Sequence, residues 1–332
     1  MSYDARWMDV ALRLGRRALG TTAENPPVGC IIVKDGKVLG VGWTRPGGRP
    51  HAETEALRMA GEAALGATAY VTLEPCAHHG RTPPCAEALV QAGIARVVTA
   101  IEDPDPRVSG GGHAILRKAG IAVEVGVGAE EARRDLAGFL TRIISKRPYV
   151  ILKLALSADD KIAAGPGQRT AITGPESAAR VHLLRAQSDA IMVGMGTVVT
   201  DDPGLTCRLP GLEQRSPQPF VMSRSRDLPP QSRLAQRGAE VLRGPVAETL
   251  AELASRGINR LMIEGGAKFA RTFLDAGLVD EVWLFRAPMV IGPQGVGVPL
   301  ERAINDFNLV EHETLGADRL TVYERRQVQS SP

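Results

Sequence analysis

The feature that most constrains this chain is a set of metal-binding side chains near its beginning. His51 and Glu53 stand two positions apart, and Cys76 and Cys85 follow. One imidazole and two thiolates are ligands that zinc prefers, and three protein ligands leave a position open for a water. A glutamate beside such a site can move protons. The chain must therefore fold so that a loop near residue 51 meets the segments that carry the two cysteines.

The spacing of the two cysteines bears on whether the zinc site is structural or catalytic. Zinc deaminases commonly close their signature with Pro-Cys-x-x-Cys. Here Pro75 precedes Cys76, but eight residues, 77–84, separate the cysteines. A structural zinc site usually takes a fourth protein ligand, and this insert offers His78 and His79. We predict instead a catalytic zinc site that removes an amino group from a ring carbon. His78 and His79 are then substrate contacts, or else ordinary surface histidines.

Composition excludes several classes of protein. The chain has 40 basic and 37 acidic residues, a net charge of +3 and only 4% aromatic residues, which argues against a nucleic-acid channel. No apolar run approaches the ~20 residues of a membrane span. Four cysteines without a secretory signal favour metal binding in a reducing compartment over disulfides. We expect a cytoplasmic protein with a small-molecule substrate and with no nucleic-acid or membrane partner.

Strands and helices alternate along the first part of the chain. A first helix is indicated by apolar residues at helical spacing around Trp7 and Leu14, and it does not resemble a targeting peptide. Further strands and helices are predicted at 28–33, 53–64, 69–73, 85–92 and 96–100. A helical pattern over 130–144 ends before Pro148, and proline disfavours helix in the residue before it. This alternation predicts an α/β domain over residues 1–146.

The alternation restarts after Pro148 and predicts a second, different α/β domain over residues 147–332. Strands and helices are expected at 149–156, 177–186, 190–193, 220–222, 260–263, 267–276 and 282–286. The stretch 208–245 is rich in Pro, Arg, Ser and Gln, and we predict loops there with the one strand at 220–222. No internal repeat relates the two halves.

The motifs of the first half resemble a known family. They are Asn25-Pro26-Pro27-Val28-Gly29, His51-Ala52-Glu53, Thr72-Leu73-Glu74-Pro75-Cys76 and the run from His78 to Cys85. Together they resemble the bifunctional deaminase–reductases of riboflavin biosynthesis. The resemblance implies a cytidine-deaminase-like α/β/α fold for the first domain. It also implies zinc at His51, Cys76 and Cys85, with Glu53 as the catalytic residue and with Asn25 and His78 at the substrate.

The second half resembles the reductase half of the same family. The chain lacks a P-loop and a Gly-x-Gly-x-x-Gly fingerprint after a strand, so neither nucleotide-binding motif explains it. The resemblance implies a dihydrofolate-reductase-like α/β fold that binds NADPH. It implies cofactor contacts at Ala155, Ala171, Thr197, Asp201, Gly266, Ala267, Lys268, Phe269, Ala270, Arg271 and Thr272. It implies substrate contacts at Arg169, Arg185, Leu205, Arg208 and Glu264.

The implied function has two steps on one phosphoribosylated pyrimidine. Zinc hydrolysis removes an exocyclic amine, and NADPH then reduces the ribosyl group to a ribityl chain, in a homodimer. A ribose phosphate needs guanidinium partners, and Arg185 and Arg208 suit that role.

The sequence departs from the family at three places, one of which is Asp159-Asp160, where the family prefers an Asp-Gly pair. Thr44 stands where the family commonly has a histidine that faces the substrate. Ser223-Arg224 stands where an acidic residue followed by Ser or Thr is common. These departures leave open a deaminase whose reductase domain has changed its role. A nucleoside or nucleic-acid deaminase and a non-catalytic zinc protein are the remaining alternatives.

Overall fold

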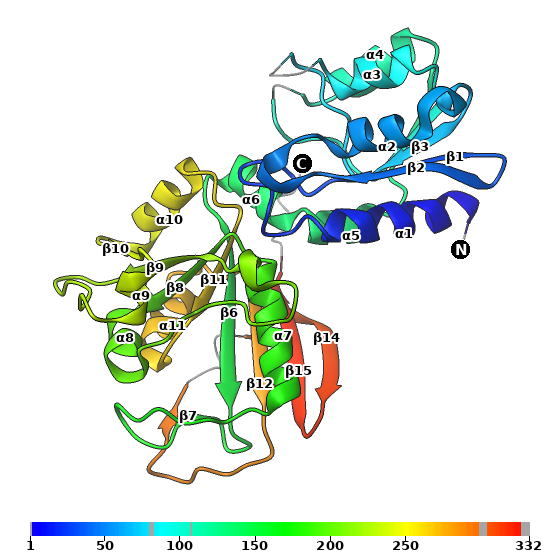
Figure 1. Ribbon diagram of the computed structural model, residues 1–332. Helices are drawn as coiled ribbons and strands as arrows, with labels where there is room; N and C mark the ends of the chain where they lie inside the picture. Colours follow the sequence, from blue (N-terminus) through cyan, green and yellow to red (C-terminus); the bar gives the residue numbers. More distant parts are fainter. Residues whose placement is uncertain (1, 80–82, 107, 299–303, 327–332) are drawn as a thin grey trace. The chain divides into compact units, whose positions relative to one another are not determined.

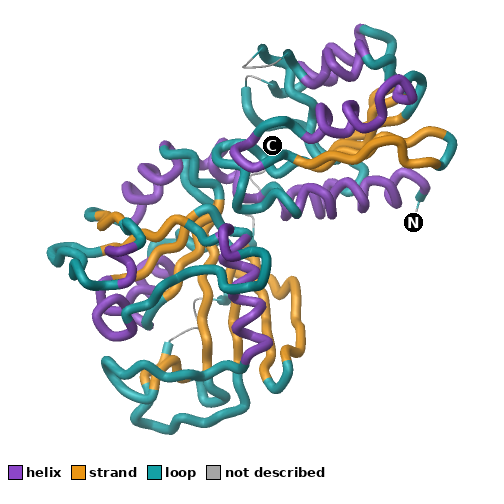
Figure 2. The backbone as a smooth tube through the Cα atoms, viewed as in Figure 1, coloured by secondary structure: helices purple, strands orange, loops and turns teal. Residues whose placement is uncertain are grey.

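The computed structural model divides the chain into two compact units, Met1–Lys146 and Arg147–Pro332 (Figure 1). It describes residues 2–79, 83–106, 108–298 and 304–326. Residues 80–82 of the predicted substrate loop lie outside these ranges. In each unit the strands form the middle of the fold, with helices and loops around them (Figure 2). Within the described ranges, no helix is both long and apolar enough to cross a membrane.

The first unit is built on a five-stranded sheet with the order β2-β1-β3-β4-β5. β1 runs antiparallel to β2 and β3, whereas β3, β4 and β5 are parallel. The strands are β1 (Gly29–Lys34), β2 (Lys37–Trp43), β3 (Thr68–Val71), β4 (Arg96–Thr99) and β5 (Ala122–Val125). The apolar runs predicted near 28–33, 69–73 and 96–100 form β1, β3 and β4, because their side chains are buried on both faces of the sheet.

Helices cover both faces of this sheet, so the unit is an α/β/α sandwich (Figure 1). One face carries α1 (Tyr3–Arg16) and α5 (Ala129–Asp135), and the other carries α2 (Ala52–Ala60), α3 (Cys85–Gln91) and α4 (Gly111–Lys118). The amphipathic pattern explains the placement of α1. Its buried positions, among them Trp7, Met8 and Ala11, recur at helical spacing and pack into the core.

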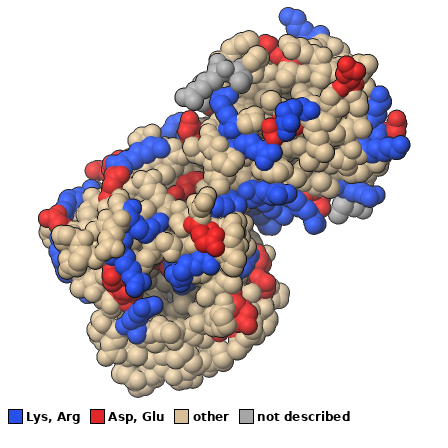
Figure 3. Space-filling model, in the orientation of Figure 1, with Lys and Arg blue, Asp and Glu red and all other residues tan. Residues whose placement is uncertain are grey.

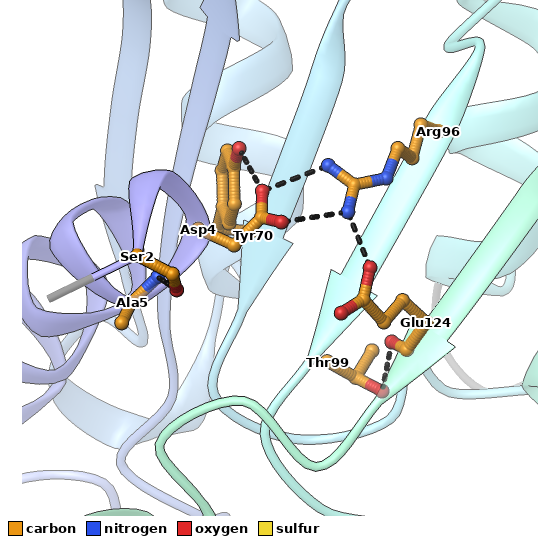
Figure 4. Close-up of polar contacts among 7 residues, drawn as sticks. All are labelled: Ser2, Asp4, Ala5, Tyr70, Arg96, Thr99 and Glu124. Atoms are coloured by element: carbon orange, nitrogen blue, oxygen red, sulfur yellow. Dashed lines mark hydrogen bonds and ion pairs between the residues drawn. The ribbon is translucent and has the colours of Figure 1, made fainter.

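A half-buried polar network fixes the start of α1 to the sheet (Figure 4). The Asp4 carboxylate accepts hydrogen bonds from the Tyr70 hydroxyl at 2.7 Å and from the Arg96 guanidinium at 2.8 and 2.9 Å. Arg96 also pairs with Glu124 of β5. The hydrogen bond from Arg96 lowers the pKa of Asp4 below its usual value. Asp4 thus connects α1 with β3 through Tyr70 and with β4 through Arg96, and Arg96 adds the link to β5.

The second unit is built on an eight-stranded sheet with the order β10-β9-β8-β11-β6-β12-β15-β14. The six strands from β10 to β12 are parallel, and the hairpin β14–β15 is added antiparallel at one edge. The strands are β6 (Tyr149–Leu156), β8 (Ala190–Gly194), β9 (Gln218–Met222), β10 (Glu240–Leu242), β11 (Arg260–Glu264), β12 (Glu281–Arg286), β14 (Phe307–Leu315) and β15 (Asp318–Arg325). A small second sheet pairs β7 (Lys161–Ala163) with β13 (Val296–Gly297).

Two apolar cores lie on the two faces of this large sheet. Along β6, Val150 and Leu152 belong to one core and Ile151 to the other, as the alternation of a strand requires. The first core includes side chains of α10 (Val246–Ser255) and α11 (Ala267–Asp275). The second includes side chains of α7 (Pro175–Ala186), α8 (Met195–Asp201) and α9 (Arg233–Gln236).

Several sequence-based boundaries are wrong. The helix predicted over 53–64 is α-helical only as far as Ala60, because Gly61 adopts a φ of +54° and a 3-10 turn follows. The pattern over 130–144 forms two helices, α5 and α6 (Ala137–Ser145), because the chain turns at the fully buried Leu136. The stretch 208–245 contains α9 and β10 besides the predicted strand, and the buried Leu234 anchors α9 in the core.

The surface carries both signs of charge. On the face drawn in Figure 3, Lys and Arg groups are interspersed with Asp and Glu on each unit. Ion pairs account for part of this mixture, such as Arg256 with Glu240 and Glu252. The pattern agrees with the small net charge of +3.

Candidate functional site

Three side chains of the first unit converge on one point. His51 Nδ1 lies 3.7 Å from Cys76 Sγ and 3.3 Å from Cys85 Sγ. The three ligand atoms all lie within 4.8 Å of one another. Among the described residues, no fourth His, Cys, Asp or Glu joins this cluster. The exposed His79 pairs with Glu87 instead, at 3.2 Å.

Local structure explains why these residues meet. His51 is the N-cap of α2, and Cys85 is the first residue of α3, after Pro84 in an extended conformation. Cys76 follows β3 and accepts a hydrogen bond from the Cys85 backbone N–H at 3.2 Å. Two helix N-termini therefore point at the cluster, and their free N–H groups and dipoles favour negative charge there.

The two sulfurs share their protons unequally. Hydrogen bonds from Cys85 and His51 lower the pKa of Cys76 to about 4. The hydrogen bond to the Cys76 thiolate raises the pKa of Cys85 well above its usual value, and burial adds to this. Without a cation, the negative charge of one sulfur opposes ionisation of the other. A bound cation removes this opposition, because both thiols then ionise as ligands.

Glu53 lies in the first turn of α2, two residues after His51, and its side chain is buried. Burial raises the pKa of Glu53 to about 7, although the neighbouring His51 opposes the shift. A carboxyl group with such a pKa can both accept and donate a proton near neutral pH. Glu53 therefore has the properties of a general acid–base group beside the cluster.

Asn25, the predicted substrate contact, is held in a turn before β1. Its side-chain amide lies against Gly48, which has a φ of +84° and where a Cβ would come within 2.0 Å of Asn25 Nδ2. Thr44 is buried in the same region. Its hydroxyl donates to the Pro26 carbonyl at 2.9 Å and accepts from the Val28 N–H at 3.0 Å. Thr44 thus braces the Asn25 turn through backbone groups, unlike the substrate-facing histidine that the resemblance implies at this position.

In the second unit, the carboxyl end of β11 carries a buried charge cluster. Arg185 of α7 donates two hydrogen bonds to Glu264, at 2.9 and 3.1 Å. Lys153 lies opposite Glu264 in the neighbouring strand β6. Burial lowers the pKa of Lys153, and the charge of Glu264 opposes that shift. The structure therefore brings together two predicted substrate residues and a lysine that we did not predict.

Most of the predicted cofactor residues lie where β8 and β11 lead into helices, whereas Ala155 lies in β6. Gly266 is the N-cap of α11, which contains the predicted contacts up to Thr272. Gly265 has a φ of +152°, and a Cβ there would lie 3.1 Å from the Phe269 ring and 3.3 Å from Thr197 Oγ1. This close approach connects the start of α11 with α8, which carries Thr197 and Asp201. In open α/β sheets, ligands bind at the carboxyl ends of strands.

The remaining predicted contacts lie in two loop segments, after β7 and after α8. Leu205 is buried and Arg208 is exposed. Arg169 and Ala171 are exposed in the stretch after β7. Burial raises the pKa of Asp201, and the positive charge of Arg169 opposes that shift. Asp201 Oδ1 is buried with no hydrogen-bond partner among the described residues. Such an atom fits a site completed by a polar ligand.

Known protein families match the two units of the chain separately. Residues 1–101 match the cytidine and deoxycytidylate deaminase zinc-binding region, and residues 148–321 match the RibD C-terminal domain. The riboflavin biosynthesis protein RibD of Escherichia coli is 40% identical over 331 residues, which cover 89% of this chain and 90% of that protein. The chain belongs to the RibD family. RibD of Aquifex aeolicus is 39% identical, with 97% and 98% covered.

Solved RibD structures share the whole architecture. The Acinetobacter baumannii RibD structure has a TM-score of 0.89 at 38% identity and covers 98% of this chain and 99% of its own. A Thermotoga maritima deaminase/reductase has a TM-score of 0.87 at 33% identity, with 97% and 99% covered. The predicted fold class, the bifunctional deaminase–reductase function in riboflavin biosynthesis and the cofactors zinc and NADPH are thereby confirmed for a RibD-family chain.

The donor set of the first unit fits zinc of the catalytic type. One imidazole nitrogen and two sulfurs converge, and the described residues supply no fourth side-chain ligand. Catalytic zinc sites use three protein ligands and leave one position open. The orientation of His51 adds a detail that the sequence did not contain, because Nδ1 is the nitrogen that faces both sulfurs.

Sequence reasoning missed several residues that shape the RibD reductase unit. Lys153 had a detectable signal, since it interrupts an apolar strand. His182 and Arg237 had none, because each acts on the backbone of a distant loop: His182 Nδ1 donates to the Thr206 carbonyl at 3.0 Å, and Arg237 donates to Gly204 and Pro217. Only the folded chain shows these contacts.

Proposed function

We propose that the first unit deaminates a diaminopyrimidine that carries a ribose phosphate, and that the second unit reduces the ribosyl group of the product to a ribityl chain. The Thermotoga maritima relative is described as a diaminohydroxyphosphoribosylaminopyrimidine deaminase and 5-amino-6-(5-phosphoribosylamino)uracil reductase. The observation that carries the proposal is the convergence of His51 Nδ1 with the sulfurs of Cys76 and Cys85 beside a buried Glu53.

In the first step, His51, Cys76 and Cys85 hold zinc. When bound, zinc lowers the pKa of a water toward ~7. With zinc held there, Glu53 would accept a proton from the water that attacks the ring carbon bearing the amino group. Glu53 then donates the proton to the departing nitrogen, so that the C–N bond breaks and ammonia leaves. Asn25 and His78 contact the substrate and hold the ring in the orientation for attack.

In the second step, bound NADPH would supply a hydride to C1 of the ribosyl group as the bond from C1 to the ring oxygen breaks, and solvent would supply the proton that this oxygen gains. Ala155, Ala171, Thr197, Asp201 and the residues from Gly266 to Thr272 hold the cofactor. Arg169, Arg185, Leu205, Arg208 and Glu264 hold the substrate. The exposed guanidinium of Arg208 suits the phosphate. Arg185 is already paired with Glu264. The Glu264 carboxylate repels a phosphate and therefore binds the sugar hydroxyls of the substrate.

The test is Glu53→Gln with both activities measured on the full chain. We expect ammonia release to fall by roughly 10²–10⁴-fold, because the proton carrier is lost. NADPH oxidation on substrate that has already been deaminated should stay unchanged. Glu55→Gln is the matched control, since Glu55 lies on the same turn but pairs with Arg45 and Arg58. Loss of both activities in a folded Glu53→Gln protein, or retention of ammonia release, would contradict the proposal.

We also propose that the protein acts in the cytoplasm as a homodimer formed through the second unit. This follows the resemblance to the family, and light scattering of the full chain tests the stoichiometry. A monomer at concentrations that support both activities would contradict the dimer.

A further inference from the structure

The loop 204–217 of the second unit carries two of the proposed substrate contacts, Leu205 and Arg208. It runs from the end of α8 to the start of β9 (Figure 1). Apart from the short 3-10 helix Glu213–Arg215, it has no regular backbone hydrogen bonding. Within the loop, the Ser216 hydroxyl accepts from the Cys207 N–H at 3.0 Å and donates to the Glu213 carbonyl at 2.9 Å. The stretch around Leu205 is held by side chains from elsewhere in the unit.

Leu205 shows that the loop is held in a strained conformation. Its φ is +50°, in the left-handed region that residues other than glycine rarely adopt. Its side chain is nevertheless 3% exposed and packs in the core beneath α7 and α8. Such a conformation persists only where the surroundings determine it, and it is frequent at ligand sites.

Backbone groups on both sides of Leu205 are tied down. The carbonyl before it, on Gly204, accepts a hydrogen bond from Arg237 Nη1 at 2.6 Å. The carbonyl after it, on Thr206, accepts from Arg185 Nη1 at 3.0 Å and from His182 Nδ1 at 3.0 Å. The Arg237 contact fixes the peptide group that precedes Leu205, and the contacts to Thr206 hold the chain one residue further along.

Arg237 differs from the other anchors because it joins the two ends of the loop. Its Nη1 binds Gly204, and its Nη2 donates to the Pro217 carbonyl at 3.0 Å, just before β9. One planar guanidinium thus bridges the point where the chain leaves α8 and the point where it enters the sheet. The fork geometry of arginine allows this, and a lysine has a single nitrogen for the same task.

Arg237 is itself positioned by α9. It is the C-cap of that helix, which Leu234 anchors in the core with no exposed surface. At the other end of α9, the Arg233 backbone N–H donates to Asp202 Oδ1 at 2.8 Å. The short helix therefore contacts the chain before the loop and at both loop ends.

The charge environment of Arg237 is unusual. It is half-buried, and among the described residues no carboxylate forms an ion pair with it. Burial lowers the pKa of its guanidinium, and the nearby positive charge of Arg185 lowers it further. A half-buried cation without a counter-charge costs free energy of folding. The Arg237 guanidinium offsets this cost through its hydrogen bonds to two carbonyls, and its charge adds positive potential beside Arg185.

We propose that Arg237 is a positioning residue of the reductase site, which holds Leu205 and Arg208 in the geometry that binds the phosphorylated substrate. The inference rests on the proposed function, in which Leu205 and Arg208 contact that substrate. Arg237 itself need not touch the substrate. Its effect is exerted through the two backbone carbonyls at the ends of the loop.

The test compares Arg237→Met with Arg237→Lys in the full chain. We expect Arg237→Met to raise the KM for the deaminated phosphoribosyl substrate about 10-fold or more, while kcat changes less than about 3-fold. The Kd for NADPH and the rate of ammonia release should stay at wild-type values. Arg237→Lys should recover part of the loss, because one hydrogen bond to a carbonyl remains.

Arg256→Met is the matched control, since Arg256 lies in the same unit and pairs with Glu240 and Glu252 at the surface. A wild-type KM in Arg237→Met would overturn the inference. If Arg237→Met also loses NADPH binding, Arg237→Lys decides: a raised KM with NADPH binding intact supports the inference, and a wild-type KM overturns it.

Arg208→Met separates this inference from the proposed function. A raised KM in Arg208→Met together with a wild-type KM in Arg237→Met rejects only the positioning role. Wild-type KM values in both variants reject the proposed substrate contacts themselves.

Discussion

The Arg185 guanidinium and the Glu264 carboxylate form an ion pair through two hydrogen bonds, of 2.9 and 3.1 Å. Their side chains are only 11% and 13% exposed. Each group therefore compensates the charge of the other in a place where water contributes little. A substrate that binds here has to engage a pair that is already formed, so the pair supplies both a rigid anchor and a fixed orientation.

Breaking this pair should destabilise the second unit. We expect Glu264→Gln to lower its free energy of unfolding by roughly 3–5 kcal/mol, because Arg185 is left buried without its counter-charge. Hydrogen exchange of peptides from β6 and β11 in increasing urea measures the effect in that unit alone. Glu252→Gln breaks an exposed pair with Arg256 and should cost less than about 1 kcal/mol. Equal effects of the two variants would contradict the expectation.

The same pair predicts a dependence of stability on pH. Burial raises the pKa of Glu264, but the charges of Arg185 and Lys153 outweigh burial, and the pKa lies below its usual value of 4.5. Below about pH 4.5 the unfolded chain binds the proton more readily than the folded chain does, so the stabilisation is lost as pH falls through the folded-state pKa. The difference in stability between wild type and Glu264→Gln should therefore shrink from pH 7 to pH 3.5. A difference that stays constant over this range would contradict the assignment.

Removal of zinc should separate the two activities. Because the ligand atoms all come from the first unit, we expect a chelator to abolish ammonia release and to leave NADPH oxidation on deaminated substrate intact. Cys76→Ser should reduce bound zinc in the same way, as measured by metal analysis of the purified protein. Cys207→Ala is the control, since Cys207 is a buried free cysteine of the second unit. Zinc loss in the Cys207 variant, or full zinc in the Cys76 variant, would be inconsistent with the site.

Thr44 should matter through its hydroxyl. We expect Thr44→Val to destabilise the first unit by roughly 0.5–1.5 kcal/mol, because the Pro26 carbonyl and the Val28 N–H lose the hydroxyl and keep only the hydrogen bond to each other. Thr44→Ser keeps both hydrogen bonds and should retain most of the stability. Hydrogen exchange of the peptide that contains β1 and the KM for deamination report the change. Identical behaviour of the valine and serine variants would show that the hydroxyl has no such role.

The zinc cluster was predictable because its residue types are rare together and their chemistry is narrow. The residue types of His51, Cys76 and Cys85 indicate a metal site however far apart they stand in the sequence. The structure brings their ligand atoms together. Strand β6 was predicted with its observed bounds, because a long apolar run between turns has few alternatives. Residues whose chemical type is specific for one function can be identified from the sequence before the fold is known.

The rest depended on tertiary contacts. Short elements such as α9 have little periodicity, and one buried leucine decides their position. Arg237 looks like any surface arginine in the sequence, and its role arises from two carbonyls at the ends of a distant loop. The hydroxyl of Thr44 likewise acts on backbone groups, which no pattern of side chains reveals.

The register of the large sheet has a consequence for the protein during synthesis. All five strands of the first unit have emerged by Val125, before β6 exists. β6, however, pairs Val150 with Leu261 in β11 and Leu154 with Leu284 in β12. At roughly 5–20 residues per second, the ribosome needs on the order of ten seconds to add those partners. During that time the apolar strand β6 has both edges unpaired. In a chain that ends before β11, β6 has neither of its two neighbouring strands.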